Sequence, residues 1–165
     1  MPRPKNNRLV HAPPIFTEFK PVGVAMRSLA QIQLSLDEYE ALRLADYDGF
    51  SHQEAADEMH ISRSTFTRLI EQARKKIAGF IMDGKVLTIE GGHVHFRHNI
   101  IRCQDCGHMF KTNILDTITH CPECRSDHLL NLAGGFGHGR CCYPIHHNNK
   151  KGGHYARRRQ NRSAR

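Results

Sequence analysis

Hydrophobic positions recur at helical spacing in three segments between residues 35 and 83. Ser35, Ser51 and Ser62 each precede one segment, and the first two are followed three residues later by a glutamate, which is the capping-box pattern. The third segment carries the longest apolar stripe, made of Phe66, Leu69, Ile70, Ala73, Ile77 and Ile81. These patterns predict three helices, of which the first ends at Asp48-Gly49 and the last near Asp83-Gly84.

Shorter runs on either side of the helices favour strands. Residues 15–19 and 32–34 could form short strands in a segment that three prolines keep from forming a long helix. Residues 85–90 and 93–97 are β-prone runs joined by Gly91-Gly92, which predicts a β-hairpin. In this hairpin His93, His95 and His98 are expected to face solvent.

Residues 52–69 fit the geometry of a helix-turn-helix. Ala56 is the small residue where two helices would cross, and His60 lies in the turn, where a residue with positive φ is usually required. The apolar places are taken by Ala55, Met59, Ile61, Phe66 and Leu69. The second helix would then offer polar side chains to the major groove of DNA.

The candidate DNA contacts are the polar residues of that second helix and its start. Arginine can bind guanine through two hydrogen bonds, and serine or threonine can reach base edges or phosphates. Arg74 and Lys75 lie farther along, where phosphate contact is expected. The full set is Ser62, Arg63, Ser64, Thr67, Arg68, Arg74 and Lys75.

Four of the six cysteines form two C-x-x-C knuckles separated by fourteen residues. A tetrahedron of thiolates suits Zn²⁺, so Cys103, Cys106, Cys121 and Cys124 are the candidate ligands of a structural zinc ion in a zinc ribbon, with a short hairpin through Phe110 and Ile114. An iron–sulfur cluster or a redox disulfide pair is an alternative. His108 and His120 lie beside the ligands and could replace one of them.

A second group of metal ligands follows the knuckles. Cys141, Cys142, His138 and His146 could form a second metal or redox site. The alternative is a flexible, histidine-rich tail with spare thiols.

The net charge of +8 is concentrated at the end of the chain, because residues 150–165 carry seven Lys and Arg and no acid. Such a tail is suited to bind polyanions without sequence preference, and the alternative is a solvated tail that aids solubility. No apolar run is long enough to span a membrane, and the basic N-terminus leads into no apolar segment, so we expect a cytoplasmic protein that binds no membrane.

The expected fold class is therefore mainly α: a three-helix helix-turn-helix domain with a possible β-hairpin wing, a small zinc ribbon and a basic flexible tail. The expected divisions are an N-terminal extension at residues 1–34, the helix-turn-helix domain at 35–98, the zinc ribbon at 99–132 and a Gly-, His- and Arg-rich tail at 133–165.

Six blocks in residues 19–23, 36–46, 53–56, 62–66, 73–78 and 87–92 resemble a known prokaryotic family. It is the domain-of-unknown-function 134 family, also called uncharacterised protein family 0251. The resemblance implies a DNA-binding protein whose helix-turn-helix is similar to region four of sigma-70-type factors.

Together these features favour a sequence-specific DNA-binding protein that acts as a transcription regulator. Its expected partners are double-stranded DNA, RNA polymerase and a second copy of the chain. The alternative is a metal- or redox-handling protein, a sensor or carrier, whose helical domain is a docking scaffold. An enzyme is not expected, because the sequence shows no nucleophile–base order and no phosphate-binding loop.

Overall fold

The computed structural model describes residues 8–138 and Cys142. Its helical elements are η1 (Met26–Ser28), α1 (Leu36–Leu42), the π-helical turn η2 (Arg43–Tyr47), α2 (His52–Glu58), α3 (Arg63–Asp83) and α4 (Leu132–Gly135). Its strands are β1 (Arg8–Val10), β2 (Glu18–Phe19), β3 (Gln31–Leu34), β4 (Val86–Ile89), β5 (Val94–Phe96), β6 (His98–Cys103), β7 (Met109–Asn113) and β8 (Leu129–Asn131).

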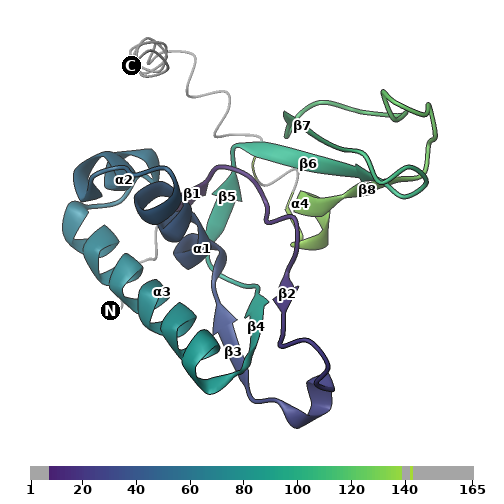
Figure 1. Cartoon of the computed structure of the whole chain (residues 1–165). Helices are drawn as coiled ribbons and strands as arrows, with labels where there is room; N and C mark the ends of the chain where they lie inside the picture. The colour runs from purple at the N-terminus through teal and green to yellow at the C-terminus, as the bar shows by residue number, and fades with distance from the viewer. Residues whose placement is uncertain (1–7, 139–141, 143–165) are drawn as a thin grey trace, which may run out of the picture.

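The expected mainly α fold class is wrong, because the described residues form a mixed structure with three small sheets. One sheet pairs β1 with β5, another has the order β2-β4-β3, and the third has the order β7-β6-β8. In Figure 1 the helices α1 to α3 gather on one side and the β7-β6-β8 sheet lies on the other. Of the unexpected strands, β1 pairs with the distant β5, whereas β6 pairs with β7 across the first knuckle.

The three predicted helix starts are confirmed by their capping contacts. The backbone N–H of Ser35 donates to Glu38 Oε2 at 2.8 Å, and that of Ser51 donates to Glu54 Oε2 at 3.0 Å. Ser62 Oγ accepts a hydrogen bond from the Thr65 N–H at 3.2 Å. Each contact satisfies an N–H group that the first helical turn leaves without a helical acceptor.

Helices α1, α2 and α3 bury one cluster of side chains, made of Ala41, Leu44, Ala55, Ala56, Met59, Phe66, Leu69 and Ile70. The predicted apolar stripe of α3 is correct as far as Ile77 but wrong at its end. Ile81 is 66% exposed, because the last turns of the helix pack instead through Phe80, which lies against the buried cluster that includes Leu87.

The predicted hairpin around Gly91-Gly92 is wrong. Strand β4 pairs with β2 and β3, whereas β5 pairs in parallel with β1. The two glycines instead pass close to the start of α1, where the Leu36 N–H donates to the Gly91 carbonyl at 3.1 Å. A Cβ on Gly92 would lie 3.1 Å from a carboxylate oxygen of Asp37, so glycine is required there by close packing as well as by its positive φ.

A second cluster of buried side chains joins both ends of the described chain. It contains Val10 from β1, Leu34 and Leu36 around the start of α1, strand residues of β4 and β5, and also Ala133 and Cys142. Residues that follow the cysteine module therefore pack against strands that precede it. Within the described ranges, no helix is both long and apolar enough to cross a membrane.

Candidate nucleic-acid interface and metal clusters

The first half of α3 presents an exposed polar face. Arg63, Ser64 and Arg68 are exposed, and Thr67 is half-buried beside them. These four residues line a shallow surface hollow. The opposite face of the same turns carries Phe66, Leu69 and Ile70, which are buried against α1 and α2. The helix is therefore anchored on its apolar side and open on the side that carries Arg63 and Arg68.

The turn between α2 and α3 has the conformation expected from the sequence. His60 has φ of 55°, one of two positive φ values at described residues other than glycine. Ala56, expected at the helix crossing, is fully buried, and its carbonyl accepts the Ile61 N–H at 3.0 Å. The turn thus reverses the chain over Ala56, where no larger side chain would fit without displacing the core.

Contacts from outside the helices fix the end of α2. The Leu9 N–H of β1 donates to the Met59 carbonyl at 3.2 Å. Arg97 donates to the carbonyl of Glu58 at 2.8 Å and to its carboxylate at 3.1 Å. Carbonyls at a helix end need such donors, so the strands around β1 and β5 hold α2, and through it the turn into α3.

Replacing His60 by glycine should stabilise the protein. A non-glycine residue in the left-handed region costs about 1–2 kcal/mol, of which glycine recovers part at the expense of a larger unfolded-state entropy. We expect the free energy of unfolding in urea to rise by up to about 1 kcal/mol. His120→Gly is the matched control, because His120 is exposed and lacks a positive φ, and it should not stabilise. A loss of stability in His60→Gly would contradict the strain at this turn.

Four of the predicted DNA contacts have partners within the protein. Ser64 Oγ lies 3.2 Å from Ser62 Oγ. Ser62 caps α3. The hydroxyl of Thr67 lies 3.0 Å from His52 Nδ1 across the α2–α3 junction. Arg74 forms an ion pair with Asp46 of η2 at 2.7 Å, which raises the pKa of the guanidinium through the hydrogen bond to that carboxylate. Arg63, Arg68 and Lys75 are exposed and have no hydrogen-bond or ion-pair partner among the described residues, whereas Ser62, Ser64 and Arg74 are exposed but partnered.

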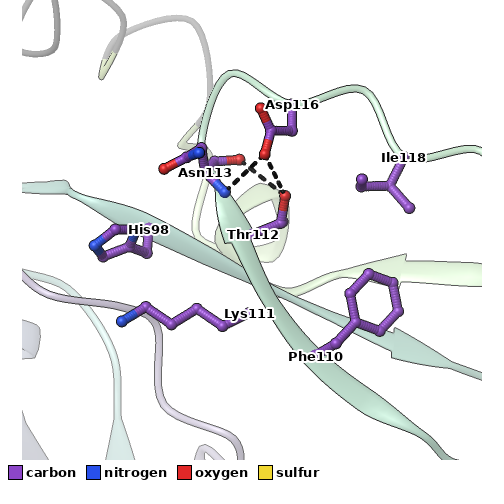
Figure 2. Close-up of a pocket in the computed structure, with 7 residues that line it drawn as sticks. All are labelled: His98, Phe110, Lys111, Thr112, Asn113, Asp116 and Ile118. Carbon is purple, nitrogen blue, oxygen red and sulfur yellow. Dashed lines mark hydrogen bonds between the residues drawn. The ribbon is translucent and has the colours of Figure 1, made fainter. Parts of the chain in front are cut away.

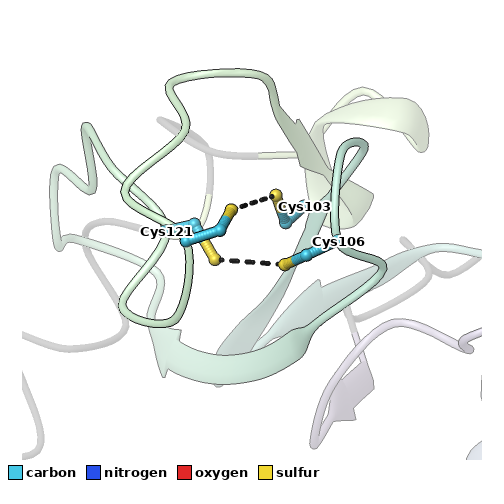
Figure 3. A group of neighbouring side chains, drawn as sticks. Cys103, Cys106 and Cys121 are labelled. Carbon is cyan, nitrogen blue, oxygen red and sulfur yellow. Dashed lines mark hydrogen bonds between the residues drawn. The ribbon is translucent and has the colours of Figure 1, made fainter.

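The four knuckle cysteines come together in the fold. Cys103 Sγ lies 3.5 Å from Cys124 Sγ, and Cys106 Sγ lies 3.7 Å from Cys121 Sγ. Figure 3 shows the side chains of Cys103 and Cys106 turned toward the knuckle of Cys121. A disulfide would need about 2.05 Å, whereas sulfurs about 2.3 Å from a central zinc ion in a tetrahedron lie about 3.8 Å apart. The four thiols are therefore placed to hold one metal ion.

The two knuckles have the same backbone design. In the first, the Gly107 N–H donates to the Cys103 carbonyl at 3.1 Å, and in the second the Arg125 N–H donates to the Cys121 carbonyl at 2.9 Å. Gly107 and Arg125 both have positive φ. The first knuckle joins β6 to β7 and the second lies in the loop before β8. The hairpin expected through Phe110 and Ile114 is wrong, because β7 pairs with β6 instead.

The electrostatics of the cluster favour a cation. Backbone N–H groups, chiefly that of Cys106, lower the pKa of Cys103 to about 6. The Ser126 N–H acts in the same direction on Cys124, but the neighbouring thiols, above all that of Cys106, outweigh it and raise the pKa to about 12. Thiolates at these distances repel one another, which disfavours ionisation of more than one of the four cysteines. A bound metal cation is what would allow all four to be thiolates at once.

A polar hollow lies on the outer side of β7 (Figure 2). It is lined by His98, Phe110, Lys111, Thr112, Asn113, Asp116 and Ile118. The Asp116 carboxylate accepts hydrogen bonds from Thr112 Oγ1 at 3.0 Å and from the Asn113 N–H at 3.2 Å. The Asp116 carboxylate thus stabilises the start of the loop that leads to the second knuckle.

Two members of the predicted second metal group also come together. Cys142 Sγ lies 3.7 Å from His138 Nδ1, and it lies 3.6 Å from Nδ1 of His95 on β5. Cys141 and His146 lie outside the described residues. His95 was expected to face solvent, and that expectation is wrong, because β5 turns this side chain toward the segment after α4. No local pattern signals this contact, since His138 lies 43 positions after His95 in the sequence.

The surroundings of both histidines in this group lower their pKa. Burial lowers the pKa of His95, and burial together with the nearby charge of His95 lowers that of His138. The ring of His138 also packs edge-on against Phe96, with ring centroids 5.0 Å apart.

Comparison with known proteins gives a single family. The family model described as "Protein of unknown function DUF134" matches residues 1–97. A UPF0251 protein of Chloroherpeton thalassium is 48% identical over 143 residues, which cover 85% of this chain and 95% of that protein. UPF0251 proteins of Pelotomaculum thermopropionicum and Moorella thermoacetica are 41% identical over 126 residues and 38% identical over 141 residues. These alignments cover 76% and 86% of this chain and 95% and 93% of the respective relatives.

No solved structure matches this chain. The family resemblance seen in the sequence blocks is confirmed by these relatives, and the chain belongs to the family of unknown function called DUF134 or UPF0251.

Proposed function

We propose that this chain is a sequence-specific DNA-binding protein that regulates transcription, and that α3 reads the major groove. The observation that carries the proposal is the exposed face formed by Arg63, Ser64 and Arg68 at the start of a helix whose other side is buried. A recognition helix needs this combination, because its polar face must enter the groove while its apolar face fixes its angle.

The contacts around α2 support the same proposal. Strand β1 and Arg97 hold the end of α2, and the His60 turn then sets the direction of α3. Base readout requires side chains that are positioned by a rigid scaffold. We assign base contacts to Arg63, Ser64 and Arg68, and phosphate contact to Lys75. Arg74 reaches phosphate only if it leaves Asp46, and Ser62 and Thr67 serve the fold of the helix.

We propose zinc as the metal of the four-cysteine cluster, which makes residues 98–131 a zinc ribbon. Three observations support a structural Zn²⁺ ion. They are the all-sulfur ligand set, the C-x-x-C spacing, and Sγ–Sγ distances close to those of a zinc-centred tetrahedron. An iron–sulfur cluster needs the same four thiolates, and metal analysis of protein purified without added metal separates the two. A DNA-binding role also places the protein in the cytoplasm.

Selection of bound duplexes from a random pool tests the proposed function. The zinc-loaded full chain should enrich a short motif that contains guanine, since arginine pairs best with the guanine edge. A motif with two symmetric halves would indicate that two copies bind together. The double variant Arg63→Ala/Arg68→Ala should enrich no motif. Failure of the wild-type protein to enrich any sequence would overturn the proposal.

A further inference from the structure

The group formed by His95, His138 and Cys142 lies apart from the four-cysteine cluster and is built by two distant segments. His95 belongs to β5, and His138 and Cys142 follow α4. One ligand atom from each residue lies within 4.8 Å of the other two. The two Sγ–Nδ1 distances, 3.6 and 3.7 Å, both converge on Cys142.

These distances match a shared metal ion. With sulfur about 2.3 Å and nitrogen about 2.05 Å from a tetrahedral zinc ion, the sulfur–nitrogen edge is about 3.6 Å. Hydrogen bonds from two imidazoles to one thiol would have similar lengths, so the surroundings of the sulfur must decide between the two arrangements.

Those surroundings favour a thiolate that is balanced by a cation. Cys142 is fully buried, and its sulfur accepts a hydrogen bond from the Phe96 N–H at 3.4 Å. Phe96 and Ala133 belong to the same buried cluster. A buried thiolate is costly unless a positive charge lies beside it. The two imidazole nitrogens that face the sulfur are the ligands that a Zn²⁺-class ion takes together with a thiolate.

We propose that His95, His138 and Cys142 form a second metal site that takes a borderline transition-metal ion of the Zn²⁺ class. Binding releases the proton of the Cys142 thiol and leaves a thiolate and two neutral imidazoles on the ion. The fourth position is open to water. The ion fastens the segment after α4 to β5, beside the strands that hold α2. The site does not depend on whether the chain binds DNA.

Zinc titration of the metal-free full chain tests the proposal. We expect the wild-type protein to bind one more tightly held equivalent of Zn²⁺ than His95→Gln or Cys142→Ser. His93→Gln is the matched control, because His93 is exposed and lies two residues before His95, and it should keep the wild-type count. Equal zinc content in His95→Gln and the wild type would overturn the second site.

X-ray absorption of the zinc-loaded wild-type protein gives a readout that needs no variant. Two occupied sites should lower the mean number of sulfur ligands per zinc clearly below four and add imidazole scattering, which His95→Gln should remove. An all-sulfur environment, or imidazole scattering that survives in His95→Gln, would contradict the proposal. If only the four-cysteine proposal fails, zinc binding persists in Cys103→Ser and is lost in His95→Gln.

Discussion

Cys103→Ser should abolish metal binding at the four-cysteine cluster and unfold the sheet of β6, β7 and β8. Cys103 ends the central strand of that sheet and is fully buried. The sheet has few large buried side chains of its own, whereas zinc binding in small modules contributes on the order of 10 kcal/mol. Loss of the ion should therefore remove most of the free energy that holds residues 98–131 folded. Hydrogen exchange of the β6 amides should become fast, while that of α3 should change little.

The matched control for this variant is Gln104→Ala, because Gln104 is exposed in the same knuckle. It should retain the metal and the slow exchange of β6. A chelator should reproduce the effect of Cys103→Ser in the wild-type protein. Slow β6 exchange after complete zinc removal would show that the sheet is stable without its metal.

Arg68→Ala should weaken binding to the selected DNA motif by roughly 5- to 150-fold, which corresponds to the 1–3 kcal/mol of a bidentate arginine–guanine contact. Binding to unrelated duplex should change much less. Arg63→Ala should act in the same way at a neighbouring base. Fluorescence anisotropy with the selected motif and a scrambled duplex measures both effects.

Two controls separate the effect of an arginine's position on α3 from the effect of its positive charge alone. Arg102→Ala removes an exposed arginine from the cysteine module and should leave the preference for the motif intact. Deletion of residues 150–165, which lie outside the described residues, should flatten the salt dependence without changing the preference. If the double variant Arg63→Ala/Arg68→Ala kept the preference for the motif, α3 would not be the helix that reads the DNA sequence.

The helices and the four-cysteine cluster could be predicted because their signals are local. A serine followed by a glutamate three residues later, an apolar stripe and a C-x-x-C turn each determine geometry within a few residues. The positive φ at His60 was also predictable, since the turn between two crossing helices requires it. Ile81 shows the limit of such patterns, because periodicity cannot tell which side chain of a turn, here Phe80 rather than Ile81, packs against the rest of the fold.

The sheet of β1 and β5 and the sheet of β2, β4 and β3 could not be predicted, because their pairings are long-range. Strand β1 pairs with β5 more than 80 residues away, and β3 pairs with β4 across the whole helical region. Gly91-Gly92 has the composition of a hairpin turn, but it serves the close approach to Asp37 instead. The site around His95 could not be predicted for the same reason, because its neighbours His138 and Cys142 follow the cysteine module in the sequence.

Amide chemical-shift mapping of the zinc-loaded full chain with its selected duplex tests the central claim most directly. The largest perturbations should fall on the amides from Ser62 to Arg68, with smaller ones near Lys75. The amides of β7, on the far side of the molecule, should stay close to their free positions. Unperturbed amides between Ser62 and Arg68 in the saturated complex would contradict the assignment of α3 as the DNA-reading helix.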